Sequence, residues 1–404
     1  MDDLLKGENS LPRSGFPLIR FIIASVLTLP VLAYFVIVTI VKDWVTGGET
    51  ITSLFGGLVW KSPAGLVQRA ASKTAILVTA VRYIGYKEGW TNDYLARHFI
   101  PSEMATLIDR APVFQIGYPI SLWFHSGYLM ARTQIGDRIL LNRKPKQVVL
   151  LGAGLDTRAH RLDIPSTTRI YEIDIATTQA LKRAAAKAHP DEFKRADIKY
   201  ISVDFSRESF VEKLKQEAPE FDFSDSDTVV LFEGVSMYLE WEALKTTMEM
   251  VSSNFAPGTL VTMDVLDDMS SSKKTTVDAG SAEDKVKATM TGGEGYFKRT
   301  LQRLRYAQFK QFVLAVDRIG EPFQWGIPQG ESAQSVFSKL GFDVVVDAKG
   351  KDMEKVFLTP PGASRPIGRS IGFGHCLVLS VTKSSAASNA IKPTTADAVP
   401  PPSS

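Results

Sequence analysis

Residues 147–175, QVVLLGAGLDTRAHRLDIPSTTRIYEIDI, are the stretch that decides the fold. Its first run, 148–151, is apolar and rich in β-branched residues, and it ends at Gly152-Ala153-Gly154. A second run, 169–173, follows and leads directly into Asp174. This order predicts a strand, a glycine turn, a short helix and a second strand, which is how a doubly wound α/β fold begins.

The glycine turn and the carboxylate after the second strand predict a nucleoside-binding site. Gly152 and Gly154 let the backbone turn tightly and approach a ligand with no Cβ atom in the way. At the tip of the next strand, the Asp174 carboxylate can accept hydrogen bonds from two ribose hydroxyls. Glu172 lies two residues earlier on the same face of the strand and is the less favoured partner.

The missing third glycine argues against a dinucleotide. In the pattern G-x-G-x-x-G that position is Thr157 in this chain. Asp156 also lies in the turn, where its negative charge would repel a pyrophosphate. S-adenosylmethionine carries a sugar and a base but no phosphate, so the pattern favours a methyltransferase over a dehydrogenase.

The same stretch carries a family resemblance. VVLLGAGLDTRAHRL followed by YEIDI resembles the first two motifs of the leucine carboxyl methyltransferase-like family, which includes polyketide O-methyltransferases. The resemblance covers about 70–385 and implies a seven-stranded class I methyltransferase (Rossmann-like) sheet behind an N-terminal helical cap. Three further motifs agree in order, and they lie at 72–82, 131–137 (ARTQIGD) and 232–239 (FEGVSMYL).

Downstream of the turn, strands alternate with helices, as such a sheet requires. Candidate strands are 147–151, 169–173, 199–203, 228–232, 259–264, 342–346 and 376–381, and helical signals fall near 176–188, 207–217, 240–253, 298–315 and 331–340. Ahead of the first strand, helical spacing predicts the cap at 64–86, 90–99, 102–110 and 119–142.

Composition divides the chain into five parts. Within the part 146–383, the polar, Gly-rich segment 270–295 is expected to be a surface loop or a lid. The parts are a polar N-terminal tail (1–15), a transmembrane anchor (16–45), a juxtamembrane connector with the helical cap (46–145), an S-adenosylmethionine-binding methyltransferase domain (146–383) and an Ala/Ser/Pro-rich disordered tail (384–404).

Residues 21–41, FIIASVLTLPVLAYFVIVTIV, predict a single membrane-spanning helix. They carry no charge and, at 1.5 Å per residue, extend about 31 Å, enough for the hydrocarbon core of a bilayer. A buried core helix is the alternative. Two arguments about its orientation disagree. Lys6, Arg13 and Arg20 favour a cytoplasmic N-terminus, which would place the catalytic domain across the membrane. The cytosolic supply of S-adenosylmethionine favours a cytoplasmic catalytic domain, and this is the orientation we expect.

Composition also limits the partners. With 44% hydrophobic and 23% charged residues the chain is an ordinary globular protein, and its net charge of +3 is scattered rather than gathered on one segment. A nucleic-acid partner is therefore not expected. No metal site is predicted either. The single cysteine, Cys376, excludes an internal disulfide and is expected to be buried in a late strand.

The family resemblance implies which residues hold S-adenosylmethionine. Gly152 would line its amino-acid tail beside Gly154, and Asp174 would bind its ribose. Asp204 and Phe205 match the pair that flanks the adenine.

Three charged residues complete the implied site. Glu233 matches an acidic residue near the methionine amino group. Arg132 matches an arginine that pairs with the cofactor's carboxylate, for which a guanidinium is well shaped; the alternative for Arg132 is a surface ion pair with nearby Asp137. Lys73 matches a family lysine, although its flanking residues differ.

The expected reaction is a direct displacement of the sulfonium methyl by an acceptor oxygen. The protein would mainly align the reactants and exclude water. A carboxylate acceptor needs no general base, whereas a phenol or an alcohol does. Tyr238 and His125 are the candidates to contact the acceptor or take its proton, with Tyr128 as a third; a lone histidine in a helix is alternatively a packing residue.

The sequence thus predicts a membrane-anchored O-methyltransferase. Its acceptor would be a carboxylate or hydroxyl of a small molecule, or a protein carboxylate, although the anchor and the 270–295 loop depart from the leucine carboxyl branch. Two alternatives stay open: a catalytically silent, membrane-anchored binding protein with a methyltransferase fold, and a dinucleotide-dependent oxidoreductase.

Overall fold

A computed structural model shows how the chain folds. From 112 to 126 it describes the backbone alone. The described residues are 4–5, 73–87, 89–100, 102–110, 112–205, 207–267, 321–359, 364, 370 and 374–382.

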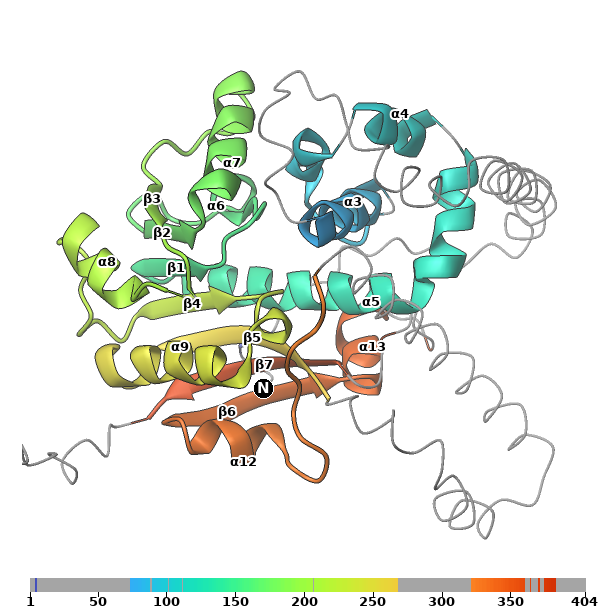
Figure 1. The fold of residues 1–404 in the computed structure, drawn as a ribbon. Helices are drawn as coiled ribbons and strands as arrows, with labels where there is room; N and C mark the ends of the chain where they lie inside the picture. The colour runs from blue at the N-terminus through green and yellow to red at the C-terminus, as the bar shows by residue number, and fades with distance from the viewer. Residues whose placement is uncertain are drawn as a thin grey trace, which may run out of the picture.

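Seven strands form one sheet in the order β3-β2-β1-β4-β5-β7-β6 (Figure 1). Neighbouring strands are parallel except β7, which is antiparallel to both β5 and β6. Strand order reverses between β1 and β4, and this reversal places a ligand crevice at the carboxyl edge of the sheet. The strands are β1 (Gln147–Leu151), β2 (Arg169–Asp174), β3 (Lys199–Ser202), β4 (Thr228–Phe232), β5 (Leu260–Leu266), β6 (Phe342–Lys349) and β7 (Gly374–Val381).

Helices cover both faces of this sheet (Figure 1). Helices α5 and α13 pack on one face, and α8, α9 and α12 on the other. The helices are α3 (Lys73–Lys87), η1 (Tyr94–Phe99), α4 (Ser102–Arg110), α5 (Pro112–Arg143), α6 (Arg158–Arg161), α7 (Ala176–Ala188), α8 (Phe210–Glu217), η2 (Ser236–Tyr238), α9 (Trp241–Asn254), α12 (Ala333–Ser338) and α13 (Lys351–Phe357), of which η1 and η2 are 3₁₀ helices.

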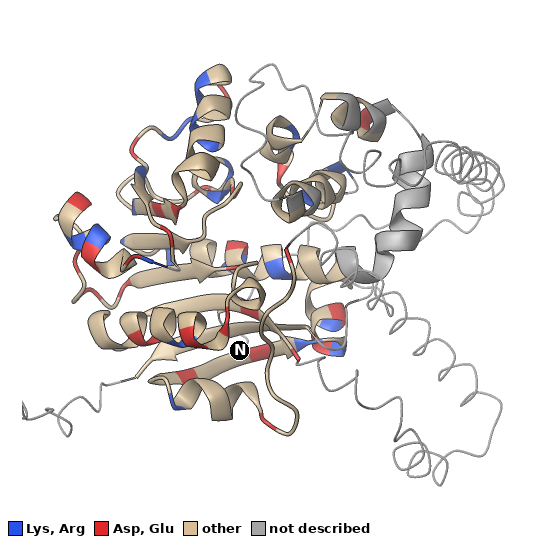
Figure 2. Ribbon diagram, in the orientation of Figure 1, with Lys and Arg blue, Asp and Glu red and all other residues tan. Residues whose placement is uncertain are grey.

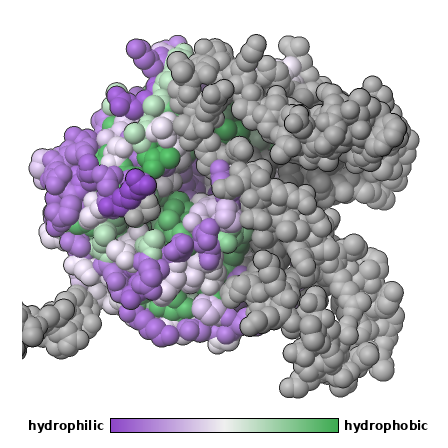
Figure 3. Space-filling view, viewed as in Figure 1, coloured by the Kyte–Doolittle hydropathy of each residue, from purple (hydrophilic) through white to green (hydrophobic). Residues whose placement is uncertain are grey.

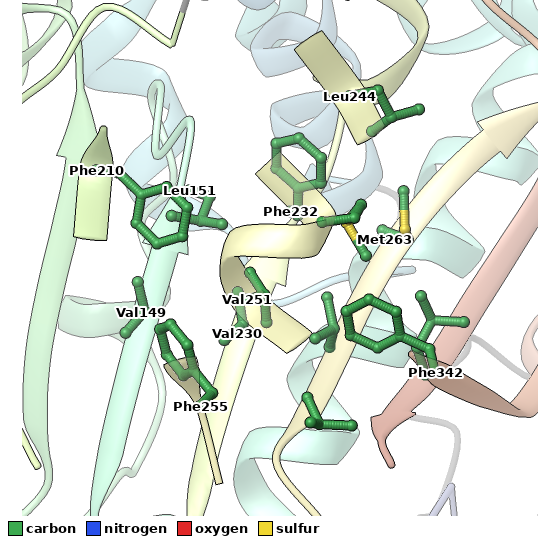
Figure 4. Packing of buried hydrophobic residues seen from close by; sticks show 14 of the residues in the cluster. Val149, Leu151, Phe210, Val230, Phe232, Leu244, Val251, Phe255, Met263 and Phe342 are labelled. Carbon is green, nitrogen blue, oxygen red and sulfur yellow. The ribbon is translucent and has the colours of Figure 1, made fainter. Parts of the chain in front are cut away.

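Alternation along the strands supplies a separate core to each face. Val148 of β1 belongs to the core under α5, and Val149 belongs to the core under α9. Figure 4 shows the second core, where Phe210, Phe232 and Phe342 come from three different elements and are almost fully buried. Because all five residues of β1 and of β4 are buried, these central strands read as continuous apolar runs in the sequence.

The sequence predicted most of these elements. Every predicted strand is present, with ends shifted by at most three residues. Helix α5 begins earlier than expected because Pro112 is a favourable first helical residue. Helix α6, of four residues, is the helix predicted between the glycine turn and the second strand. Helix α13, of seven residues, was missed because it is too short to show helical periodicity.

Several predicted segments lie outside the described residues. They are the anchor 16–45 with its span 21–41, the connector 46–72, the loop 270–295, the helix 298–315 and the tail 384–404. Among the helices that the structure does describe, none has the length and apolar character needed to cross a bilayer. The membrane anchor therefore stays a prediction from the sequence alone.

The described surface mixes charges of both signs. Both signs are mixed along α8 and α13, whereas α7 carries basic residues alone (Figure 2). Hydrophilic residues dominate the side that carries α7 and α8 (Figure 3). In the interior, Cys376 of β7 is buried as predicted, and burial raises the pKa of its thiol well above the ordinary value.

Candidate functional site

A cavity of about 590 Å³ lies at the carboxyl edge of β1, β4 and β5, with α3 and α5 in its wall. It is the place where strand order reverses, as expected for a ligand site in this kind of sheet. Seven of the predicted site residues line it: Arg132, Gly152, Gly154, Asp174, Phe205, Glu233 and Tyr238.

The glycine turn forms the part of the wall next to β1. Gly152 and Gly154 have backbone φ values of +67° and +50°, which residues other than glycine rarely adopt. A Cβ atom on Gly152 would lie 2.4 Å from Cγ2 of Val235, whereas a Cβ on Gly154 would meet nothing closer than 3.8 Å. Gly152 is therefore required by packing as well as by backbone conformation.

Asp174 is held in place by the backbone. Its Oδ2 accepts a 2.6 Å hydrogen bond from Gly154 N–H, and its Oδ1 accepts one of 2.7 Å from Ile175 N–H. Burial raises the pKa of Asp174, and these two hydrogen bonds partly offset that rise. Because the carboxylate is fixed at the cavity wall and has four lone-pair sites, it is positioned to bind a pair of hydroxyls.

Glu172 has a different role from its neighbour on the strand. It is 1% exposed, it does not line the cavity, and its Oε2 lies 2.6 Å from the ammonium of buried Lys182. Burial raises the pKa of Glu172 to about 7, against the opposing effect of Lys182. The geometry thus leaves Asp174 as the carboxylate of β2 that a ligand can reach.

Arg132 and Glu233 lie together in the cavity wall, with a third residue that the sequence analysis missed. Arg132 Nη1 donates a 2.7 Å hydrogen bond to Oδ2 of Asp264, and Arg132 Nε lies 3.9 Å from Oε2 of Glu233. Asp264 is fully buried in β5, and its Oδ1 accepts a hydrogen bond from Gly234 N–H at 2.6 Å. The alternative surface pair of Arg132 with Asp137 is wrong, because Asp137 binds Arg158 instead.

Arg158 is the centre of an ion-pair network in the cavity wall, and the sequence did not single it out. Its guanidinium contacts Asp137 at 2.7 Å, Asp156 at 2.5 Å and Glu233 at 2.9 Å. Burial alone would lower the pKa of Arg158, but these carboxylates raise it well above its ordinary value. The run D-T-R-x-x-R at 156–161 places an acidic residue and two arginines close together and could have indicated this network, but it was interpreted only as a family motif.

The turn is also unsuited to a pyrophosphate, but not for the electrostatic reason expected from the sequence. The charge of Asp156 is balanced by Arg158, so it is not a free negative charge in the turn. Instead, an oxygen of Asp156 accepts the N–H of Arg158 at the start of α6, where a pyrophosphate would have to bind. Thr157, in the third glycine position, is buried and donates to Asp93 of the cap at 2.6 Å.

Phe205 and Asp204 are separated by the fold. Phe205 lines the cavity, whereas Asp204 does not; its side chain is 47% exposed and lies 3.7 Å from Arg207. The predicted contact of Asp204 with an adenine therefore stays a prediction, for a side chain that lies outside the cavity wall. A role for Phe205 as an apolar surface for the base agrees with its position.

The two predicted catalytic residues are described to different extents. Tyr238 lines the cavity with its ring 5.2 Å from that of Phe323, and burial raises the pKa of its hydroxyl. His125 lies on the part of α5 whose side chains are not described, and the side chain of Lys73, the first residue of α3, is likewise outside the description. Tyr128 lines the cavity too, and its hydroxyl donates to Asp264 at 3.3 Å.

The cavity wall fits S-adenosylmethionine. Arg132 Nε and Glu233 Oε1 are buried and have no hydrogen-bond partner among the described residues. One is a donor and the other an acceptor, which match the α-carboxylate and α-ammonium of an amino acid. Gly136 leaves room for the Glu233 carboxylate, because a Cβ there would lie 2.5 Å from Oε1.

Comparison with known proteins identifies relatives. The model of the leucine carboxyl methyltransferase family matches residues 75–252. A provisionally assigned S-adenosyl-L-methionine-dependent methyltransferase from Streptomyces coelicolor is 32% identical over 211 residues, which are 49% of this chain and 67% of that protein. Proteins of the same description from Mycobacterium avium and Mycobacteroides abscessus are 28% and 30% identical over 46% and 47% of this chain, which spans 61% and 63% of their own lengths, less than two thirds of each.

Solved structures with a similar arrangement of elements include the following two. A provisionally identified methyltransferase from Thermobifida fusca shares 16% identity, and the match covers 80% of this chain and 100% of that chain with a TM-score of 0.46. A DUF574 family protein from Streptomyces avermitilis shares 9% identity, covering 78% and 99% of the two chains with a TM-score of 0.44. The fold assignment rests on the strand order rather than on these scores.

Proposed function

This chain belongs to the leucine carboxyl methyltransferase family of S-adenosylmethionine-dependent methyltransferases, and we propose that it transfers the methyl group to a carboxylate or hydroxyl oxygen of an apolar small molecule. The observation that carries the proposal is a single cavity whose wall joins the glycine turn and Asp174 to Tyr238 and Phe323. One part of that wall suits a nucleoside with an amino-acid tail. The other part suits an apolar acceptor.

The chain's contribution to the reaction is positioning. When bound, S-adenosylmethionine supplies a methyl group already activated on a sulfonium centre. Asp174 would hold the ribose, and Arg132 and Glu233 would hold the carboxylate and ammonium of the tail, each in a position set by its buried hydrogen bonds. Because these side chains are preorganised, reactants need little reorganisation to reach an in-line geometry.

The remaining wall of the cavity suggests the acceptor. Part of that wall is apolar, with Val78 of α3, Leu129 of α5 and Phe323 among its residues. Polar residues lie among them, including Thr74, Gln324 and Glu321. Such a wall favours an acceptor with an aliphatic or aromatic body and excludes water from the reacting oxygen.

The raised pKa of Tyr238 limits what this residue can do. A hydroxyl with a raised pKa stays protonated at neutral pH, so Tyr238 would donate a hydrogen bond to the acceptor rather than remove its proton. A carboxylate acceptor, which is already ionised, is consistent with that arrangement. For a hydroxyl acceptor, Glu321 is a carboxylate in the same wall, where its Oε2 accepts the N–H of Thr74 at 3.1 Å.

Titration calorimetry on the full chain in mild detergent tests the cofactor. We expect S-adenosylhomocysteine to bind and NAD(P) not to bind; the opposite result would favour the oxidoreductase alternative. Absence of S-adenosylhomocysteine binding by folded protein would overturn the proposal.

Methyl transfer is tested separately with radiolabelled S-adenosylmethionine and two matched panels, apolar carboxylic acids and the corresponding phenols or alcohols. We expect label in at least one panel. Cofactor binding without label in either panel or in fractionated cell extract would instead support the catalytically silent alternative. The membrane anchor at 21–41 and a cytoplasmic catalytic domain remain predictions from the sequence, and comparing soluble with vesicle-embedded acceptors tests them.

A further inference from the structure

Two histidines and a glutamate meet on the surface away from the cavity. His98 belongs to η1 of the cap, His189 follows the last turn of α7, and Glu192 lies in the turn after it. One ligand atom from each lies within 4.8 Å of the other two. None of the three lines the cavity, so the cluster is separate from the methyltransferase site.

His98 presents a buried nitrogen whose polar contact, with Glu192, lacks hydrogen-bond geometry. Its side chain is 9% exposed, and its Nε2 has no hydrogen-bond partner among the described residues. Oε1 of Glu192 is 3.1 Å from this nitrogen, but the contact does not have the geometry of a hydrogen bond. A buried polar atom without a partner is costly, so an additional group that binds Nε2 would stabilise the fold.

The neighbouring rings hold this nitrogen in position. The His98 ring packs edge-on against the Phe193 ring, with 5.6 Å between the ring centroids. The centroids of the His98 and His189 rings are 4.0 Å apart, and the two ring planes form an angle of 36°. An ion pair between His98 and Glu192 alone would account for two of the three residues. It does not include His189, whose ring packs on that of His98 and brings a third ligand atom within 4.8 Å of the other two.

Two imidazoles and one carboxylate form a donor set typical of zinc. Zinc binds such groups at about 2.0–2.2 Å, usually in tetrahedral geometry with one position left for water. Ligand atoms in that geometry are about 3.3 Å apart, so His189 and Glu192 would have to rotate to bind one ion together with His98. His189 is exposed and Glu192 half-exposed, so both have room to move, whereas magnesium and calcium would prefer an all-oxygen site.

We propose that His98, His189 and Glu192 bind one zinc ion that joins the cap to the C-terminal end of α7. The ion would link η1 to the nucleotide-binding part of the fold. Because α3 packs on η1 and also lines the cavity, the zinc would stabilise the cap side of the cavity wall. This site does not depend on the proposed methyl transfer.

The test uses the full chain with any affinity tag removed and metals stripped by a chelator. Calorimetric titration with zinc chloride is expected to show one ion per chain, with no corresponding binding of magnesium. Cobalt in place of zinc should give the visible absorption of a four- or five-coordinate site. Zinc should also raise the melting temperature.

Three variants locate the ion. His189→Ala and Glu192→Gln change partly or fully exposed side chains. Loss of a residue that only hydrogen-bonds to a metal ligand weakens metal binding roughly 10- to 100-fold, so loss of a ligand itself should weaken zinc binding by at least as much. Asp191→Asn, which removes an exposed carboxylate one residue away, should leave the affinity unchanged. Absence of saturable zinc binding by the unaltered chain, or equal binding by all three variants, would overturn the proposal.

Discussion

Arg132 and Asp264 are 132 positions apart in the sequence, yet their side chains meet at 2.7 Å in the wall of the cavity. Asp264 is fully buried, and Arg132 has only 10% of its side chain exposed. The pair connects the cap helix α5 to β5 and presents the rest of the guanidinium to the ligand site. Its position makes it important both for folding and for binding.

Replacing Arg132 by Met should therefore destabilise the protein. The change leaves the Asp264 carboxylate buried without its cation, which costs about 3–5 kcal/mol of unfolding free energy. Urea denaturation measures this loss. Arg207→Met removes an exposed arginine that lies 3.7 Å from its carboxylate partner, and it should change stability by no more than about 0.5 kcal/mol. Equal effects of the two changes would contradict the structural role of the pair.

The two glycines of the turn should respond differently to alanine. Gly152→Ala adds the cost of a left-handed residue, about 1–2 kcal/mol, to a 2.4 Å clash with Val235 worth about 1–3 kcal/mol. Gly154→Ala adds only the conformational cost. Thermal denaturation compares them, and Val235→Ala in the Gly152→Ala background should recover the part due to the clash. A lack of recovery would show that the contact is not what makes Gly152 necessary.

Asp174 and Asp204 should also behave differently, although the family resemblance places both at the cofactor. In Asp174→Asn the hydrogen bonds to the ribose lose their charged acceptor. The binding free energy of S-adenosylhomocysteine should fall by about 1.5–3 kcal/mol, which is roughly 10- to 100-fold in affinity. Asp204→Asn changes a side chain outside the cavity and should have little effect on that affinity. Calorimetry distinguishes the two, and a large effect of Asp204→Asn would show that 204–205 rearranges when the cofactor binds.

His375 should make stability depend on pH in the alkaline range. Its ring nitrogens contact Asp347 and Asp267, both at 2.8 Å. Burial opposes its charge, but these carboxylates raise its pKa from 6.5 to about 9. The stabilisation is therefore complete below about pH 6.5 and is lost as the pH rises through 9, with a magnitude of about 2 kcal/mol after allowing for solvent at the two half-exposed carboxylates.

Denaturation between pH 6 and 10 measures that loss, and titration of His375 by NMR gives its pKa directly. His375→Gln should flatten the profile over this range. Asp347→Asn should move the transition of the unaltered histidine to lower pH. An unchanged profile in His375→Gln would mean that another group is responsible.

Local patterns in the sequence were sufficient for the fold and for the backbone of the site. The central strands were predicted because buried parallel strands require continuous apolar runs, as at 148–151 and 229–232. The turn was predicted because only glycine adopts the positive φ values found at 152 and 154 without strain. These properties depend on a residue and its nearest neighbours, so the sequence alone determined them.

Side-chain partners were decided by the tertiary structure. Asp264 was read only as part of a strand, Arg158 only as part of a motif, and His98 and His189 had no assigned role. Each acquires its partners where separate elements cross, and the positions of those crossings depend on how helices of the cap pack on the sheet. Spacing along the chain does not encode such contacts, so the balance of charge around the cavity became apparent only in the folded molecule.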